Sequence, residues 1–364
     1  MSSYNDIIGN EDPNVVVVDM GEYSTSITAV AARQGLFTPL ANKTDDKIGG
    51  QQLDQVLVQH FAKEFTKQTK VDIPQTYSEN LQESDRRAYV KLLLACEQTK
   101  RSLSASNSAG CAVESLKDGL DFNSQVNKLR FGLLASKIFN GVGELTKETV
   151  KEAGLEIENI DKIVLVGASS GLPSLTNVLS GIFVNSEILS SVDPDQAIAK
   201  GAAIQAKLLS NPNLPDLPSA TTELDVNVTS APIVIAGESE EENYIVVAQN
   251  TPLPARRLVS IPATDSSKAF IELYEGKHEI KVVQPPPREK TEDDEDDEDD
   301  EDDEDDEPER IPIVTRQSKI SSLEVPIVNK SNITLQVVIL NDGKVEIKAN
   351  QEGQSPVTTT VNAP

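Results

Sequence analysis

Apolar positions along the chain follow two patterns, and the change falls near residue 210. Before it, the runs at 15–18 and 163–166 are apolar without alternation, which is typical of strands buried on both faces. A strand at 26–32 follows the first run closely and predicts a hairpin. Helical periodicity is expected at 52–67, 85–103, 129–153 and 195–209. Residues 13–209 are therefore predicted to form a mixed α/β domain, preceded by a disordered stub at 1–12.

The second part of the chain has the pattern of an antiparallel β domain. Prolines and small polar residues in SNPNLPDLPSATT indicate a linker at 210–222. Beyond it, Asn341-Asp342-Gly343 stands between two alternating segments and predicts a hairpin. We expect a β-sandwich-like domain over 223–364. Its expected strands are 231–236, 244–249, 258–263, 269–274, 279–283, 311–315, 323–328 and 334–340.

The distribution of charge indicates an acidic insert within the β region. The formal charge is −26, and sixteen acidic residues form one unbroken run from Glu292 to Glu307. Like charges at this density repel, so the loop 285–309 is expected to be extended and disordered between two strands. It is either a solubilising loop without a partner or a segment for electrostatic contact with, or repulsion from, a charged partner surface.

Composition excludes several classes of protein. No basic patch rises above the background, which argues against direct binding of nucleic acid. Cys96 and Cys111 are too few for a disulfide framework or a four-cysteine zinc site, and His60 and His278 leave little room for histidine catalysis. No apolar run approaches the ~20 residues of a membrane span. We expect a cytoplasmic protein without a metal site.

Two loops that follow buried strands are candidate ligand sites. VDMGEYST ends the first strand and VGASSGLP ends the later one, and in open α/β sheets ligands bind at the carboxyl ends of strands. Ser169 or Ser170 is expected to cap a helix whose free N–H groups suit an anion. A turn without any ligand explains the same residues equally well.

The helix expected at 85–103 carries a polar stripe. Glu97, Lys100, Arg101 and Ser104 are spaced i, i+3, i+4 and i+7, which puts them on one face. Periodicity alone favours a solvated face with a Glu97–Arg101 pair worth ~0.2–0.5 kcal/mol.

Several segments together resemble the heat-shock protein 70 (DnaK-type) chaperone family. They are VVVVDMGEYSTSIT, IGGQQLDQVLVQHFAKEF, ACEQTKRSLSAS, IVLVGASSGLP, DPDQAIAKGAAIQAKLL and, in the β region, LYEGKHEI. The resemblance implies an actin-like (ribonuclease-H-like) half-domain, namely lobe II of an ATPase domain, followed by an abbreviated substrate-binding β domain. On this reading lobe I is missing and the chain is truncated at its N-terminus.

The resemblance also implies a nucleotide site. Glu97, Lys100, Arg101 and Ser104 match residues that contact adenosine, and Asp19 with Gly21 matches a phosphate loop. The full expected set is Asp19, Gly21, Gly49, Gly50, Glu97, Lys100, Arg101, Ser104, Gly167 and Asp195.

Departures from the family pattern concentrate at the phosphate end. Glu22, Tyr23 and Ser24 replace two glycines and a threonine, and Gly171 replaces an adenine-stacking arginine. Because glycines let the backbone approach a phosphate closely, a glutamate and a tyrosine oppose its binding. The family's other phosphate loop and its catalytic lysine belong to lobe I, which this reading lacks. The sequence therefore predicts that ATP binds without hydrolysis and that the chain is not an enzyme.

The helical lid of the family is not matched, and the linker has few leucines. With the acidic insert, these features resemble an atypical fungal branch that pairs with a J-protein of the zuotin type in the ribosome-associated complex. The implied partners are that J-protein, the ribosome through it, and another heat-shock protein 70 acting in co-translational folding. No membrane and no direct nucleic-acid partner is expected.

Two alternatives stay open. One is a truncated ATP-dependent chaperone that acts directly on unfolded polypeptides. The other is a sugar or acetate kinase of the actin-like superfamily, against which the β domain with its Tyr-Glu-Gly turn argues.

Overall fold

The computed structural model describes residues 12–33, 35–189, 191–210, 227–237, 243–262, 267–284, 308–329, 331–351 and 354–362. The chain falls into two compact units, Met1–Leu217 and Pro218–Pro364. The predicted stub at 1–12 (apart from Asp12), nearly all of the linker 210–222 and the acidic loop at 285–307 lie outside the described residues.

The first unit is built on a five-stranded sheet of order β3-β2-β1-β6-β7. β1 pairs antiparallel with β2 and parallel with β6, which confirms both buried strands and the hairpin. β3 and β7 were not predicted, because their residues are half-exposed or exposed and show no continuous apolar run. The strands are β1 (Asn14–Met20), β2 (Thr25–Arg33), β3 (Leu36–Asp45), β6 (Lys162–Val166) and β7 (Glu187–Leu189).

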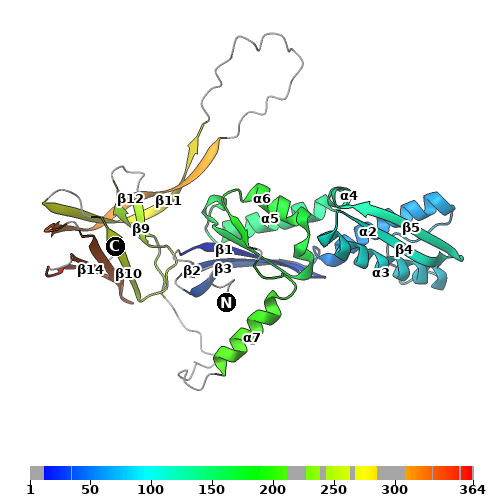
Figure 1. The fold of residues 1–364 in the computed structure, drawn as a ribbon, viewed down its shortest axis with the longest axis horizontal. Coiled ribbons are helices and arrows are strands. Elements are labelled where there is room, and N and C mark those ends of the chain that lie inside the picture. The colour runs from blue at the N-terminus through cyan, green and yellow to red at the C-terminus, as the bar shows by residue number, and fades with distance from the viewer. Residues whose placement is uncertain are drawn as a thin grey trace, which may run out of the picture. The chain divides into compact units, whose positions relative to one another are not determined.

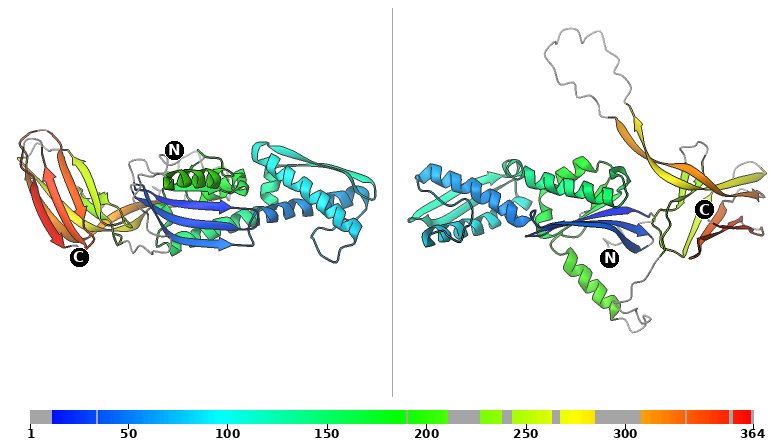
Figure 2. Two further views of the ribbon diagram at one scale, coloured as in Figure 1. Left: turned by 90° about the horizontal axis from the view of Figure 1, so that it is seen from below. Right: turned by 180° about the vertical axis from the view of Figure 1, so that it is seen from behind.

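Helices complete the first unit. α5 (Ser136–Glu152) contacts β1, β2 and β3 and packs beside α6 (Pro173–Ile182), so both cover one face of the sheet (Figure 1). α2 (Gly50–Thr69) and α3 (Glu83–Ala105) pack together with a strand pair, β4 (Ser108–Lys117) and β5 (Leu120–Asn127), at one end of the unit (Figure 2). Phe61 and Phe65 of α2 meet Phe122 edge-on at 5.8 and 5.9 Å between ring centroids.

The continuous helix predicted at 129–153 was wrong. The chain forms α4 (Lys128–Leu134) and α5, with a break at Ala135. Asn127 begins α4 by accepting a hydrogen bond from the Arg130 N–H at 2.7 Å. The apolar spacing continues through the break because Phe131 and Phe139 bury against each other on either side of it. The apolar periodicity of the segment therefore reflects the core that α4 and α5 share, and it does not show where one helix ends and the next begins.

Two short elements of 3-10 helix and a last α-helix complete the unit. The first, η1 (Ile157–Asn159), precedes β6, and the second, η2 (Ala168–Gly171), follows it. α7 (Ala197–Leu209) begins two residues later than the predicted start, because Asp195 and Gln196 lie in a turn.

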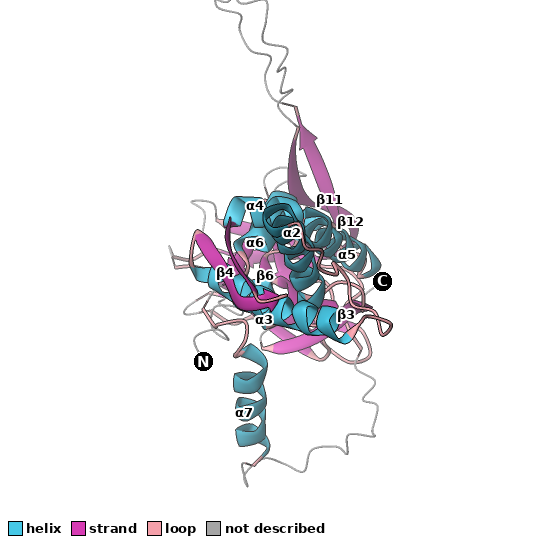
Figure 3. Cartoon of the chain, turned by 90° about the vertical axis from the view of Figure 1, so that its right-hand side faces the viewer, coloured by secondary structure: helices cyan, strands magenta, loops and turns pink. Residues whose placement is uncertain are grey.

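The second unit consists, in its described residues, of strands and loops (Figure 3). Two four-stranded sheets, β10-β13-β14-β15 and β12-β11-β8-β9, share one core in which Leu273 and Val247 of one sheet pack with Leu335 and Ile347 of the other. The expected antiparallel β fold is thus observed. Its strands are β8 (Ile233–Ala236), β9 (Asn243–Val247), β10 (Ala255–Ile261), β11 (Lys268–Val283), β12 (Glu309–Pro326), β13 (Ile333–Ile339), β14 (Lys344–Asn350) and β15 (Val357–Asn362).

β11 and β12 correct the predicted strand count. Each was expected as two short strands, but each is one long strand in a continuous antiparallel pair. The polar residues near Gly276 are accommodated by register shifts between Leu273 and Gly276, not by a turn. The predicted hairpin after β13 is confirmed: Leu340 N–H donates to Lys344 O at 2.9 Å, and Gly343 has φ +80°.

No helix within the described ranges combines the length and apolar character needed to cross a bilayer.

Candidate nucleotide-binding site

A cavity of about 530 Å³ opens in the first unit between α3, the segment after β6 and the turn before α7. Five of the ten predicted site residues line it: Glu97, Lys100, Arg101, Ser104 and Asp195. Residues far apart in the sequence therefore meet at one cavity. The remaining lining residues are Glu22, Ala168, Ser169, Gly171, Leu172, Asp193, Pro194 and Gln196.

The polar stripe of α3 divides into an exposed and a buried part. Arg101 Nη2 donates to Glu97 Oε1 at 2.6 Å, and the Arg101 side chain is 75% exposed. Ser104 Oγ donates to Arg101 O at 2.7 Å. The expected Glu97–Arg101 pair is present, and its guanidinium is largely exposed to solvent at the cavity.

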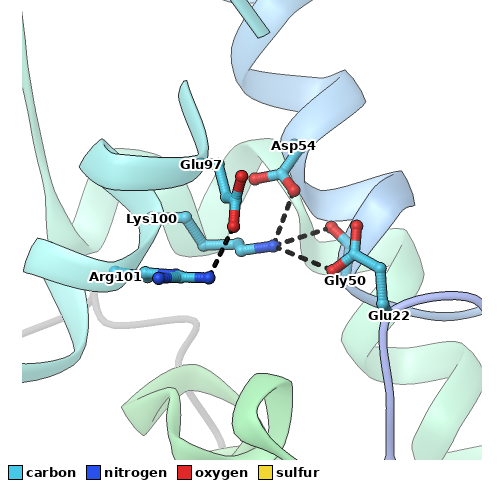
Figure 4. Close-up of polar contacts among 6 residues, drawn as sticks. All are labelled: Glu22, Gly50, Asp54, Glu97, Lys100 and Arg101. Atoms are coloured by element: carbon cyan, nitrogen blue, oxygen red, sulfur yellow. Dashed lines mark hydrogen bonds and ion pairs between the residues drawn. The ribbon is translucent and has the colours of Figure 1, made fainter. Parts of the chain in front are cut away.

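Lys100 occupies the buried part of the stripe. Its side chain is 8% exposed, and Nζ contacts Asp54 Oδ2 at 2.7 Å and Glu22 Oε2 at 3.7 Å (Figure 4). It also donates to Gly50 O at 3.1 Å. The ammonium therefore already has two carboxylate partners from the chain itself.

Asp54 was not among the predicted site residues. It lies on α2 among Leu53, Leu57 and other fully buried residues, and its side chain is 4% exposed. Burial raises the pKa of Asp54 to about 6, which the hydrogen bond from Lys100 opposes and the charge of Glu22 reinforces. An acid on an otherwise apolar helix face was a signal available in the sequence, because an unpaired buried carboxylate is costly.

The loop after β1 turns back on itself and covers the start of α2. Gly21 N–H donates to Ser24 O at 2.9 Å. Gly50 N–H donates to Gly21 O at 2.9 Å, and Gln51 N–H donates to Glu22 O at 2.8 Å. These two N–H groups at the N-terminus of α2 are therefore used within the chain and are not directed at the cavity.

Two of the predicted glycines are required by close backbone approach. A β-carbon at Gly49 would lie 2.6 Å from Glu22 O, and one at Gly167 would lie 2.4 Å from Met20 O. Gly167 also has φ +85° and donates its N–H to Pro194 O at 3.0 Å. Gly49 lets the start of α2 approach the loop after β1, and Gly167 lets the loop after β6 approach the end of β1.

Asp19 lies next to Gly167, because its strand partner in β6 is Val166. A β-carbon at Gly167 would lie 2.8 Å from Asp19 Oδ1, and burial raises the pKa of Asp19. Asp19, Gly21, Gly49, Gly50 and Gly167 do not line the cavity; they lie where the loops after β1 and β6 and the start of α2 approach one another.

Comparison with known proteins identifies the class. The mixed α/β unit, with a polar cavity at the end of parallel strands, is consistent with an actin-like ATPase fold. A family model described as "Hsp70 protein" matches residues 5–286. The chain belongs to the Hsp70 family.

The relatives agree. A heat shock protein 70 homolog of Schizosaccharomyces pombe is 34% identical over 96% of this chain and 61% of its own length. Heat shock 70 kDa protein 14-B of Xenopus laevis is 34% identical over 74% of this chain and 52% of its own. Heat shock 70 kDa protein 14 of Bos taurus is 33% identical over 76% and 54%. The chain spans about half to three-fifths of these curated relatives.

Family membership corrects one expectation. From Glu22 and Tyr23 in the phosphate loop and from the lack of a match to lobe I, the chain was expected not to be an enzyme. The Hsp70 family is a family of ATPases, so membership points to ATP hydrolysis and the prediction was wrong. Two residues that differ from the family's phosphate-loop pattern are weaker evidence about activity than a family match that extends over residues 5–286.

Replacing Gly167 by alanine should destabilise the first unit. The substitution imposes a left-handed φ on alanine and drives its β-carbon into the backbone of Met20. We expect the free energy of unfolding to fall by more than about 2 kcal/mol in denaturant titrations. Gly154→Ala is the control, because Gly154 has φ +70° but nothing within 4 Å of an added β-carbon. It should cost only ~1–2 kcal/mol. Equal losses in the two variants would contradict the close approach.

Stability should depend on pH through Asp54. Its pKa in the folded chain is about 6, against an ordinary value of 3.8, so between these values the folded state binds more protons than the unfolded state. Stability from this group is therefore lost as pH rises through that window. The free energy of unfolding of wild type minus that of Asp54→Asn is the quantity to measure. This difference should fall by roughly 1–3 kcal/mol from pH 4 to pH 7.

Asp118→Asn, in an exposed turn, controls for the general effect of removing one negative charge. A difference between wild type and Asp54→Asn that stays constant with pH would show that Asp54 is not the titrating group.

Proposed function

We propose that this chain binds ATP in the cavity of its first unit, as part of an ATP-hydrolysing Hsp70-type chaperone. The observation that carries the proposal is that Glu97, Lys100, Arg101, Ser104 and Asp195 line one cavity. Family membership supplies the nucleotide, since an Hsp70 domain implies binding of ATP or ADP.

The cavity suits the adenosine part of the nucleotide. Its volume of about 530 Å³ lies within the range of small-molecule sites. An exposed guanidinium at Arg101 is able to stack on a purine, and the Ser104 hydroxyl and Asp195 carboxylate offer hydrogen bonds to ribose or base. Lys100 would contribute mainly by positive charge, because its ammonium is buried.

We further propose that the chain works in the cytoplasm with a J-protein of the zuotin type and, through it, at the ribosome, together with another heat-shock protein 70. The support is the combination of sequence features that resembles this branch: the altered phosphate loop, the leucine-poor linker and the acidic run that follows the Tyr-Glu-Gly segment. The β unit, with a core of its own, would supply the surface for the J-protein.

Arg101→Ala should weaken ATP binding. Loss of one stacking and hydrogen-bonding cation is expected to raise the Kd for ATP by ~5- to 30-fold, measured by isothermal titration calorimetry. Arg87→Ala is the matched control. Arg87 is also paired with a glutamate one turn away on α3 and is similarly exposed, but it does not line the cavity. Equal effects of the two substitutions would contradict binding at this cavity.

The J-protein proposal predicts a stoichiometric complex. Tagged chain purified from lysate should co-migrate on a sucrose gradient with ribosomes and with one J-protein in equal amount. Removing ribosomes should leave the pair intact. A chain that instead carries many unfolded clients released by ATP would favour the chaperone that acts directly on unfolded polypeptides.

A further inference from the structure

The β unit contains a second cavity, which the proposed nucleotide site does not use. It has a volume of about 320 Å³ and lies between the two sheets, at the end of the unit where β8 begins and β13 turns into β14. One sheet contributes Ile233 and Ile320, and the other contributes Ile339 and Val345. Because the volume is at the lower end of the range for small-molecule sites, the cavity suits a small ligand.

Hydrogen bonds fix the segments that close this cavity. Leu253 N–H donates to Asn227 O at 2.8 Å. The Thr229 hydroxyl donates to Ala248 O at 2.9 Å and accepts the Thr251 N–H at 3.0 Å. Since Leu253 and Thr229 both line the cavity, its wall is held in place by contacts within the chain and does not need a ligand to form.

The lining combines apolar side chains with negative charge. Among the described residues that line the cavity, the two charged ones are the acids Glu275 and Asp342. An uncharged apolar ligand leaves these carboxylates without a new partner, and an anion is repelled by them. A ligand with an apolar body and one positive charge matches both parts of the lining. The apolar lining residues include Val228, Ile233, Leu253, Ile320, Ile339 and Val345.

Glu275 and Asp342 differ in whether a cation of the chain already neutralises them. Asp342 Oδ2 contacts Lys344 Nζ at 2.6 Å. Glu275 Oε2 accepts a hydrogen bond from the Ser318 hydroxyl at 2.7 Å, and within the part of the chain that the structure describes no cation lies at ion-pair distance from it. The charge of Glu275 is therefore the one available to a ligand.

We propose that this cavity binds a small amphipathic cation, an apolar body with one ammonium group, and that Glu275 selects its charge. The apolar body occupies the space between the sheets, and the ammonium group donates hydrogen bonds to the Glu275 carboxylate. The bound ligand thereby joins β8 and β12 of one sheet to β13 and β14 of the other. The site lies outside the unit that holds the nucleotide cavity, so it is independent of the proposed function.

Isothermal titration calorimetry of the full chain at neutral pH tests the charge preference. The probes are phenylbutylamine, which is a cation at this pH, phenylbutanol and phenylbutanoate, which share one apolar body. The cation should bind about tenfold more tightly than the alcohol, and the carboxylate should bind more weakly than the alcohol. Equal affinities of the three compounds, tighter binding of the carboxylate, or no binding of the cation would overturn the proposal.

Glu275→Gln tests the assignment of the selecting residue, because it keeps the shape of the side chain and removes its charge. The preference for the cation over the alcohol should fall below about threefold, with the affinity for the alcohol unchanged. Asp342→Asn is the matched control, since this carboxylate lines the same cavity but is already paired with Lys344. It should keep the preference within about threefold of wild type. Equal losses in the two variants would show that the total charge of the cavity decides, and the role of Glu275 would be rejected.

Val228→Trp tests whether the probes bind inside the cavity. Val228 lines it and is 39% exposed, so a larger side chain at this position can fill part of the space while the core stays packed. The Kd for phenylbutylamine should rise by about tenfold or more. Val328→Trp, at a 72% exposed position outside the lining, should leave that Kd unchanged. Unchanged binding in Val228→Trp, in a variant with the circular dichroism spectrum of wild type, would show that the cation binds elsewhere and would refute the site.

Discussion

The buried ion pair between Lys100 and Asp54 organises the candidate site. It joins α3 to α2 at 2.7 Å, in a place where neither side chain has appreciable contact with water. Removing two charges from water is costly, so such a pair adds little net stability but strongly penalises any arrangement that separates its members. The pair therefore opposes any separation of the two helices at this wall of the cavity, in addition to the apolar packing between them.

The backbone contacts around this pair form a continuous support. The carbonyls of the loop after β1 accept N–H groups from the first turn of α2, and Gly50 O accepts from Lys100. Gly167 carries the next loop within contact of Met20. The end of β1, the start of α2 and the buried Lys100 are therefore linked by hydrogen bonds next to the cavity. The exposed side chains that line the cavity are attached to these linked segments.

Much of this was predictable from the sequence. The unbroken apolar runs gave the central strands β1 and β6, and the spacing of Glu97, Lys100, Arg101 and Ser104 gave one helix face. The break at Ala135 was not predictable from periodicity, because both flanking helices contribute to a single core. The buried position of Lys100 also escaped, since spacing shows which residues share a face but not which neighbouring element covers it. Its partner Asp54 comes from a helix 46 residues away in the chain.

The pairing of β11 with β12 has a consequence for the acidic run. Val283 and Glu309 are strand partners, so the two ends of the intervening segment are held side by side by the sheet. Under this constraint the entropy of closing the loop grows only with the logarithm of its length, and doubling the number of residues costs about 0.6 kcal/mol. The run of acids can therefore lengthen or shorten between related sequences with little effect on the β unit. Its total charge is in this sense a quantity that evolution can adjust independently of the fold.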